Sequence, residues 1–245
     1  MLLKTICMKN QLENKAEMTI FEHLEELRRR IFISLSIFII TTIICFIYIK
    51  NIAYLLQQPA IGIKFLQLAP GEYFFASIRV AIYTGFLLSS PFILYQIIIF
   101  ILPGLTNKEA KLIIPLLLSS IGLFFTGIFF SYKILAPAAL TFLMSYGADI
   151  VEPIWSFEQY FNFILLLLFS TGLAFQVPII QILLGILNIF SSEQMSSYWR
   201  YIIFFATIIG AILTPSTDPI TQIIMSSAIF ILYISGILIL KVLKK

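Results

Sequence analysis

Residues 159–192, QYFNFILLLLFSTGLAFQVPIIQILLGILNIFSS, form a stretch of 34 positions without a charged side chain. About 20 apolar residues allow a helix to cross the hydrocarbon core of a bilayer, where a charged side chain is costly. Five other charge-free stretches share this character: 31–49, 80–107, 112–132, 201–217 and 219–240. The sequence therefore predicts an all-α polytopic membrane protein with six transmembrane helices, the last two of them short.

The composition favours a single membrane domain. Hydrophobic residues make up 60% of the 245-residue chain and charged residues 11%, which leaves no polar segment long enough to form a separate soluble domain. We expect a six-helix membrane domain over residues 19–240, between a polar N-terminal tail at 1–18 and a basic C-terminal tail at 241–245. Translation can start at Met1 or at Met18.

The positions of Lys and Arg predict the orientation, because these residues are enriched in the loops on the cytoplasmic side of a membrane. With the N-terminus inside, only Lys50, Lys64 and Lys133 fall in outer loops, and Arg79 lies near the outer end of the second helix. The other basic residues then lie inside: Lys4, Lys9, Lys15, Arg28, Arg29, Arg30, Lys108, Lys111, Arg200, Lys241, Lys244 and Lys245. We therefore predict that both termini are on the inner side.

Some segments depart from simple spans. Residues 19–30 have the pattern of an amphipathic helix, which we expect to lie along the inner interface before the chain turns into the membrane. The segment 50–72 contains breakers that forbid a long helix, and 133–158 is expected to form an acidic outer cap. Residues 201–213 give only about 20 Å of helix against an apolar core of about 30 Å. The turn after this fifth helix should be sunk in the membrane, or the bilayer should thin there.

Pro91 falls inside the second span. A proline lacks the backbone N–H and frees the carbonyl four residues earlier, here that of Leu87, so the helix should bend. In lipid, a freed carbonyl has to be covered by a neighbouring group. The hydroxyls of Ser89 and Ser90 are candidates for this role.

Several short motifs occur in order along the chain: HLEELRRR at 23–30, SPFILYQ at 90–96, FILPGL at 100–105, FQVP at 175–178, and LTP at 213–215 followed by Asp218. Together they resemble the TatC subunit of the twin-arginine protein translocase over nearly the whole chain. Three more motifs are most similar to the cyanobacterial and plastid branch: APGE at 69–72, STGL at 170–173 and TPSTDP at 214–219.

The resemblance implies a signal-peptide-binding site on the inner side with Glu26 and Glu109 as its two acids. A carboxylate suits this role because it accepts two guanidinium N–H bonds in a planar fork, which lysine cannot reproduce. The residues themselves also allow plainer interpretations. Glu26 can pair with Arg30 at i+4 on the helix surface, and Glu109 can be an exposed turn acid.

Two neighbours, Phe100 and Glu25, belong to the same hypothesis. Phe100 matches an aromatic residue of the family beside the site, although a Phe at a helix end often serves packing alone. Glu25 is expected either to share the role of the adjacent acid or to neutralise Arg28 and Arg29. His23 is the only histidine. Without a Cys or carboxylate cluster beside it, we expect a polar interface residue rather than a metal ligand.

Further candidates lie away from this site. Gln176 is expected to form a hydrogen bond between helices, either within the protein or toward a polar group on a partner helix, and many bacterial relatives carry Glu there. Pro178 should free the carbonyl of Ala174 and kink the helix. Asp218 fits an N-cap of the sixth helix and matches an important position of the family. Pro59 corresponds to a proline of the first outer loop and should make that loop rigid.

The resemblance implies a receptor core that binds twin-arginine signal peptides of folded precursor proteins on its inner face. It also implies TatA-type and TatB-type single-span subunits as partners, homo-oligomers within a larger complex, contact with membrane lipid, and transport driven by the proton gradient. We expect no cofactor, metal site or catalytic residue, and no binding of nucleic acid. A phosphate-binding Gly-Lys-Ser/Thr motif is absent from the sequence.

The plastid-like motifs and the abundance of Ile, Phe and Lys favour the thylakoid membrane of a plastid, with a bacterial inner or cyanobacterial membrane as the alternative. A small-molecule or ion transporter is the main alternative function, but it would be expected to have buried charges, broken helix pairs or repeated halves. An intramembrane enzyme would need paired aspartates, a histidine dyad or zinc ligands, which the spans lack.

Overall fold

The computed structural model describes residues 20–60, 64–101, 113–146, 154–187, 189–214 and 218–242. Its elements in chain order are α2 (Ile20–Ile47), α3 (Ile49–Gln57), η1 (Gln58–Ala60), β1 (Lys64–Leu66), α4 (Glu72–Ile101), α5 (Ile113–Phe130), η4 (Ser131–Leu135), α6 (Ala136–Ser145), β2 (Ile154–Ser156), α7 (Phe157–Ala174), α8 (Val177–Ile186), α9 (Ser192–Ser197), α10 (Trp199–Leu213) and α11 (Pro219–Val242).

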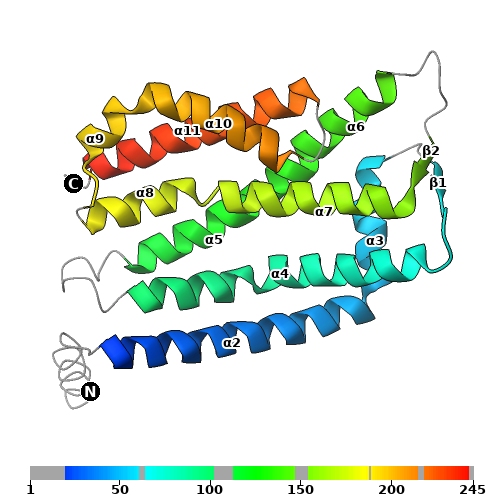
Figure 1. Ribbon diagram of the computed structural model, residues 1–245, viewed down its shortest axis with the longest axis horizontal. Coiled ribbons are helices and arrows are strands. Elements are labelled where there is room, and N and C mark those ends of the chain that lie inside the picture. Colours follow the sequence, from blue (N-terminus) through cyan, green and yellow to red (C-terminus); the bar gives the residue numbers. More distant parts are fainter. Residues whose placement is uncertain are drawn as a thin grey trace.

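The long helices run side by side along the longest axis of the molecule (Figure 1). The start of α2 and the ends of α4, α8 and α11 lie at one end of this bundle, which we call the inner end. The helix α3 and the strands β1 and β2 lie at the opposite, outer end. The first and last described helices therefore begin and end on the same side, as the distribution of Lys and Arg predicts.

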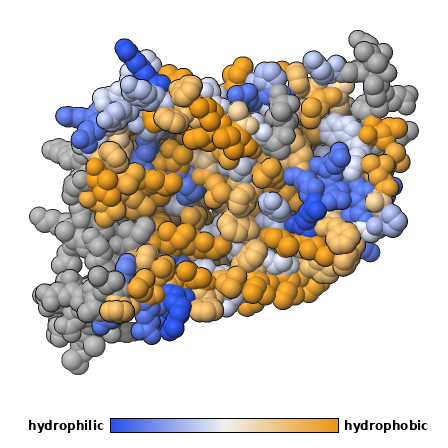
Figure 2. Space-filling model, viewed as in Figure 1, coloured by the Kyte–Doolittle hydropathy of each residue, from blue (hydrophilic) through white to orange (hydrophobic). Residues whose placement is uncertain are grey.

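The best buried helix is α7. Phe161, Ile164, Leu165 and Leu167 have no exposed surface, because α4, α5 and α10 all pack against this helix. At the edge of the bundle, α2 packs chiefly against α4. Only 6% of the residues in the most apolar part of this span are buried. Hydrophobic side chains cover much of the face in Figure 2, whereas hydrophilic ones gather toward its ends. Such a surface suits contact with lipid.

Five helical segments of the described chain are long and apolar enough to cross a membrane, and α10 is a shorter apolar helix of 15 residues. Together they correspond to the six predicted spans. The prediction that the last two helices are both short holds for α10 only. The 24 residues of α11 give about 36 Å of helix, which is enough to cross the apolar core.

The short helix α10 ends far from the outer end of the bundle. The Ser170 hydroxyl donates a hydrogen bond of 2.9 Å to the carbonyl of Leu213, the last residue of α10. Ser170 lies 12 residues beyond Glu158, at the outer end of α7, and this distance is about 18 Å of helix. Figure 1 likewise shows the end of α10 well short of the first turns of α4 and α7. The last residue of α10 therefore lies well inside the outer end of the bundle, as the length of this helix predicts.

The expectation that residues 19–30 lie along the interface and then turn into the membrane is wrong for the described part of this segment. Residues 20–47 form the single helix α2, without a break near Arg30. This stretch contains neither proline nor glycine, and the Glu26–Arg30 pair stabilises the helix across the predicted turn. The acids and arginines of this segment are therefore carried on the inner extension of the first span.

The third span is also longer than predicted. The helical segment runs over Ile114–Ser145, so Lys133 lies inside it rather than in the outer cap. One π-helical turn, η4, joins α5 to α6, and the N–H of Ala136 bonds to the carbonyl of Ser131, five residues earlier. Pro137 follows this π-helical turn, at the start of α6.

Pro91 lies inside the continuous helix α4. The Ser90 hydroxyl donates a 2.7 Å hydrogen bond to the carbonyl of Leu87, which the proline leaves without its usual partner. The Ser89 hydroxyl covers the carbonyl of Phe86 at 3.1 Å. The predicted cover by hydroxyl groups is confirmed.

The outer end is held together by the Glu72 carboxylate, the first residue of α4. It accepts hydrogen bonds from the backbone N–H groups of Leu68 (2.5 Å), Ala69 (3.2 Å) and Glu158 (3.0 Å), and from the Ser156 hydroxyl (2.5 Å). Beside it, β1 and β2 form a short parallel pair. One carboxylate thus connects the first outer segment to the start of α7, a connection that the sequence did not reveal.

Candidate functional site

The candidate site lies where α2 and α4 face each other near the inner end, a region we call the inner seam. There the Arg30 guanidinium donates two hydrogen bonds to the same oxygen of Glu26, from Nε at 3.2 Å and from Nη2 at 2.5 Å. Its Nη1 donates a third, of 2.8 Å, to Oε1 of Gln96 on α4. Arg30 therefore joins the two helices, and the i+4 pairing expected for Glu26 is confirmed.

The helical periodicity explains this arrangement. Residues four apart lie on one face of a helix, so Glu26 and Arg30 on α2 are neighbours, as are Gln96 and Phe100 on α4. At the innermost part of the seam, the ring of Phe100 stacks on that of His23, with 4.3 Å between the ring centroids and 15° between the planes. His23 therefore packs against an aromatic ring. No cluster of three or more metal-ligating residues occurs in the described ranges.

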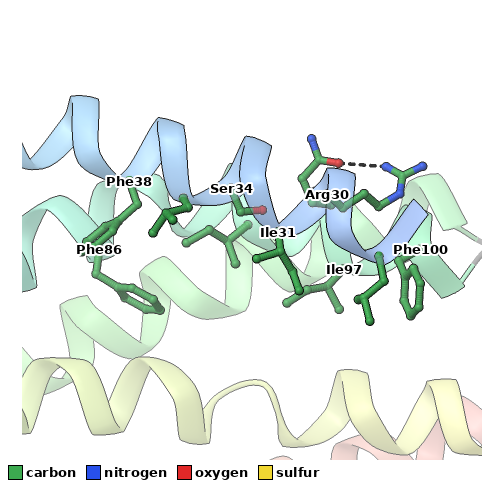
Figure 3. Close-up of a pocket in the computed structure, with 11 residues that line it drawn as sticks. Arg30, Ile31, Ser34, Phe38, Phe86, Ile97 and Phe100 are labelled. Atoms are coloured by element: carbon green, nitrogen blue, oxygen red, sulfur yellow. Dashed lines mark hydrogen bonds between the residues drawn. The ribbon is translucent and has the colours of Figure 1, made fainter. Parts of the chain in front are cut away.

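Two hollows flank the seam. The first, which we call the acidic pocket, has a volume of about 530 Å³ and is lined by Glu25, Glu26, Arg29, Arg30, Ile33, Tyr95 and Gln96. The second, the seam groove, has about 420 Å³ and an almost wholly apolar lining. Figure 3 shows this groove extending from Phe100 toward Phe38 and Phe86, with Arg30 over its inner part. Arg30 and Gln96 line both hollows and separate a polar region from an apolar one.

The two oxygens of Glu26 differ. Oε1 accepts both bonds from Arg30, whereas Oε2 is buried and has no hydrogen-bond partner among the described residues. The Glu26 side chain is 17% exposed and that of Arg30 is 20% exposed. A buried acceptor without a partner is unfavourable by about 1–3 kcal/mol, more when it is charged. Glu26 therefore retains an unused capacity to bind a donor.

Glu25 has a different environment. Its carboxylate lies 3.5 Å from Arg28, and both side chains are more than 70% exposed. Of the two interpretations offered for Glu25, this contact matches the neutralisation of Arg28, and its place in the lining of the acidic pocket also leaves it available to a ligand. Glu109 falls in 102–112, outside the described residues, so its proximity to Glu26 stays a prediction.

Gln176 and Pro178 lie far from the seam, at the break between α7 and α8. The amide of Gln176 donates a 3.1 Å hydrogen bond to the backbone carbonyl of Ser120 and accepts one of 2.6 Å from the Ser120 hydroxyl. Gln176 is 7% exposed, so its polar group is bonded within the protein. Pro178 lies in the first turn of α8, and the helical run is interrupted before it, as the proline predicts.

Asp218 and Pro59 lie in positions that match their structural interpretations. The Asp218 carboxylate accepts the backbone N–H of Thr221 at 2.8 Å, so it caps the start of α11, and the residue is 1% exposed. Pro59 lies in the short helix η1, which follows directly after α3. Neither residue lines the hollows at the inner seam.

Sequence reasoning missed Gln96, although it belongs to the SPFILYQ motif. The sequence did offer one indication, because Gln96 is a carboxamide in a charge-free, mostly apolar stretch. The position of its partner was not predictable, because Arg30 lies 66 residues away in the chain.

The fold and the seam define a polytopic helical membrane protein with a carboxylate, bound by an arginine of the same helix, beside a pocket near its inner end. The family model described as Sec-independent protein translocase protein (TatC) matches residues 22–227. This chain belongs to the TatC family.

Similar proteins agree with this assignment. The Sec-independent protein translocase protein TatC of Synechocystis is 54% identical over 96% of this chain and 93% of its own length. The chloroplastic Sec-independent protein translocase protein TATC of Oryza sativa subsp. japonica is 51% identical over 93% of this chain and 64% of its own. A crystal structure of the twin-arginine translocase receptor TatC superposes with a TM-score of 0.80 at 36% identity, and covers 91% of this chain and 100% of that chain.

Proposed function

We propose that this chain is the receptor core of a twin-arginine translocase and binds the signal peptides of folded precursor proteins at its inner seam. The observation that carries the proposal is the Glu26 carboxylate, which lines the acidic pocket and has one oxygen that no described residue bonds. A guanidinium is its natural ligand, since it presents paired N–H groups in the plane of a carboxylate.

Two adjacent arginines on a peptide require two anionic partners on one surface. Glu26 is one, and the inner loop that follows α4 carries Glu109 as the second. Phe100, at the end of α4, precedes that loop in the chain; it lines the seam groove, and its ring stacks on that of His23. Glu25 adds negative charge at the rim.

The wider function follows from the family. We propose that the chain recruits TatA-type and TatB-type subunits, forms oligomers with them, and takes part in transport driven by the proton gradient. Gln176 is our candidate for a partner-helix contact, through exchange of its bonds with Ser120 for bonds to an incoming polar group. The plastid-like motifs and the chloroplastic relative favour the thylakoid membrane as the location.

Replacing Glu26 and Glu109 together by Gln should abolish precursor binding while the protein stays inserted. Each acid provides charge-assisted hydrogen bonds of about 1.5–3 kcal/mol, which corresponds to about tenfold to more than a hundredfold in affinity per site. The measurement is binding of a twin-arginine precursor to the full chain, with site-specific photocrosslinking around both acids. Glu193→Gln is the matched control, because Glu193 is an exposed acid at the inner end in α9. Undiminished binding by the inserted double variant would rule the proposal out.

A further inference from the structure

Arg30 is an arginine already bound to the carboxylate that an arginine ligand would need. Its side chain is four-fifths buried, and three of its N–H groups are used, two by Glu26 and one by Gln96. Figure 3 shows its side chain lying over the seam groove and bonded to a neighbouring carboxamide. The same chemical group as the expected ligand therefore occupies the candidate site from within the chain.

We infer that Arg30 is an internal occupant of the site, which holds the Glu26 carboxylate until an arginine of the incoming peptide takes its place. This inference rests on the proposed function, because it presumes that Glu26 receives a signal-peptide arginine. It adds that binding is an exchange of one guanidinium for another rather than the filling of an empty site.

The geometry gives a reason for the exchange to proceed. Arg30 reaches Glu26 from four residues away on the same helix and directs both of its bonds to Oε1, which leaves Oε2 buried and without a bond to any described residue. An arginine from another chain is not bound to the helix backbone. It can approach in the carboxylate plane and bond to both oxygens, which is the stronger arrangement.

The displaced guanidinium has a position to occupy. Gln96 accepts a hydrogen bond from Nη1 of Arg30, and this bond does not involve Glu26. Release from the carboxylate therefore does not require Arg30 to lose all its partners. The acidic pocket, which both residues line, provides water-accessible space for the remaining N–H groups.

An internal competitor has a thermodynamic signature that a positioning residue lacks. It reduces the fraction of chains with a free carboxylate, and so weakens the binding of every cationic ligand at that carboxylate by the same factor. Removing Arg30 should therefore tighten the binding of an Arg-Arg signal peptide and of its Lys-Lys counterpart equally. If Arg30 instead orients Glu26 for a planar fork, its removal should weaken the Arg-Arg peptide most and reduce the discrimination between the two.

The test uses the full chain in nanodiscs and fluorescent Arg-Arg and Lys-Lys signal peptides of otherwise identical sequence. Arg30→Gln should lower Kd for both peptides by about two- to fivefold, the range expected for a partly buried ion pair within a helix. The ratio of the two Kd values should stay unchanged. In the Glu26→Gln background, Arg30→Gln should have no such effect.

Arg28→Gln is the matched control, because it removes one positive charge from the same helix but from an exposed pair with Glu25. Equal tightening by Arg28→Gln would reduce the effect of Arg30 to general charge repulsion and overturn the inference, as would weaker or unchanged binding by Arg30→Gln. Arg30→Lys keeps the positive charge and replaces Arg30→Gln in the binding measurement if Arg30→Gln does not fold. It should tighten both peptides as well, because an ammonium holds the carboxylate less well.

The same data separate the inference from the proposed function. If the original chain prefers Arg-Arg and loses this preference with Glu26→Gln, the proposed function stands whatever Arg30→Gln does. If the original chain binds both peptides alike and Glu26→Gln changes neither, the proposed function fails and the inference fails with it.

Discussion

Two carboxylates lie near the opposite ends of α4, and their surroundings differ. At the outer end, Glu72 accepts four hydrogen bonds from two separate stretches of the chain, 68–69 and 156–158, and is 4% exposed. At the inner end, and within the described part of the chain, Glu26 accepts bonds from Arg30 alone and keeps one oxygen without a partner. The first carboxylate has its bonding capacity filled by the fold, whereas the second does not.

This difference separates a structural carboxylate from a binding one. A carboxylate that is fully bonded contributes to stability and has nothing left for a ligand, because any new donor must displace an existing one. A buried oxygen without a donor is unfavourable for the folded chain and favourable for a complex that supplies the donor. Gln176, with both of its polar atoms bonded to Ser120, resembles Glu72 in this respect.

The strongest challenge to this comparison is Glu72→Gln. The amide would place an N–H group against donors that now face a carboxylate, so we expect a loss of about 2–4 kcal/mol in the free energy of unfolding. The measurement is reversible unfolding of the full chain in a bilayer mimic. Glu26→Gln should lower the same quantity by less than about 1 kcal/mol, since it weakens a single i,i+4 pair.

Glu158→Gln is the control for charge at the outer end. The Glu158 side chain is 30% exposed and pairs with Arg79, so its loss should be small. If Glu72→Gln is no more destabilising than this control, or if Glu26→Gln is more destabilising than Glu72→Gln, the distinction between a structural and a binding carboxylate is wrong.

Gln176→Leu extends the comparison to a polar side chain in the middle of the bundle whose bonds are made within the protein. It removes two hydrogen bonds to Ser120, and we expect a loss of about 0.6–2 kcal/mol in stability with normal insertion. Ser120→Ala removes only the hydroxyl and leaves the amide in place. If Gln176 also contacts a partner helix, Gln176→Leu should reduce crosslinking to TatA-type and TatB-type subunits, whereas Ser120→Ala should not. Equal crosslinking in all three proteins would make Gln176 an internal contact only.

The smallest effect concerns the depth of α10 in the membrane. Ile212 and Tyr146 are both well exposed on the protein, at 72% and 83%, but α10 ends inside the bundle and α6 ends near its outer face. In a background without Cys7 and Cys45, Ile212→Cys should react more slowly with a membrane-impermeant thiol reagent than Tyr146→Cys. A lipid-soluble reagent of the same chemistry should modify both. Equal rates with the impermeant reagent would exclude a sunken end of α10.

Charge-free stretches predicted the spans because the cost of a charge in lipid acts on each residue separately. They placed the spans well but not their ends, since α2 has no breaker before its apolar part and the third span continues past Pro137 after the π-helical turn η4. The local pairs, such as Glu26 with Arg30 and Ser90 with Leu87, follow from helical spacing and were predictable. The contacts of Arg30 with Gln96 and of Glu72 with Ser156 span 66 and 84 residues, and they depend on packing that a single sequence does not reveal.

The isolation of α2 at the edge of the bundle has a consequence for biosynthesis. Arg30 emerges from the ribosome 66 residues before Gln96, an interval of about 3–13 s at typical rates of chain elongation. During that time α2 is in the bilayer without the helix it will pack against. Because few residues of α2 are buried in the folded protein, few of its contacts are missing before α4 is made. The Glu26–Arg30 pair forms within the helix and partly neutralises its charged end from the start. The first span is thus built to be stable alone in lipid before the rest of the receptor exists.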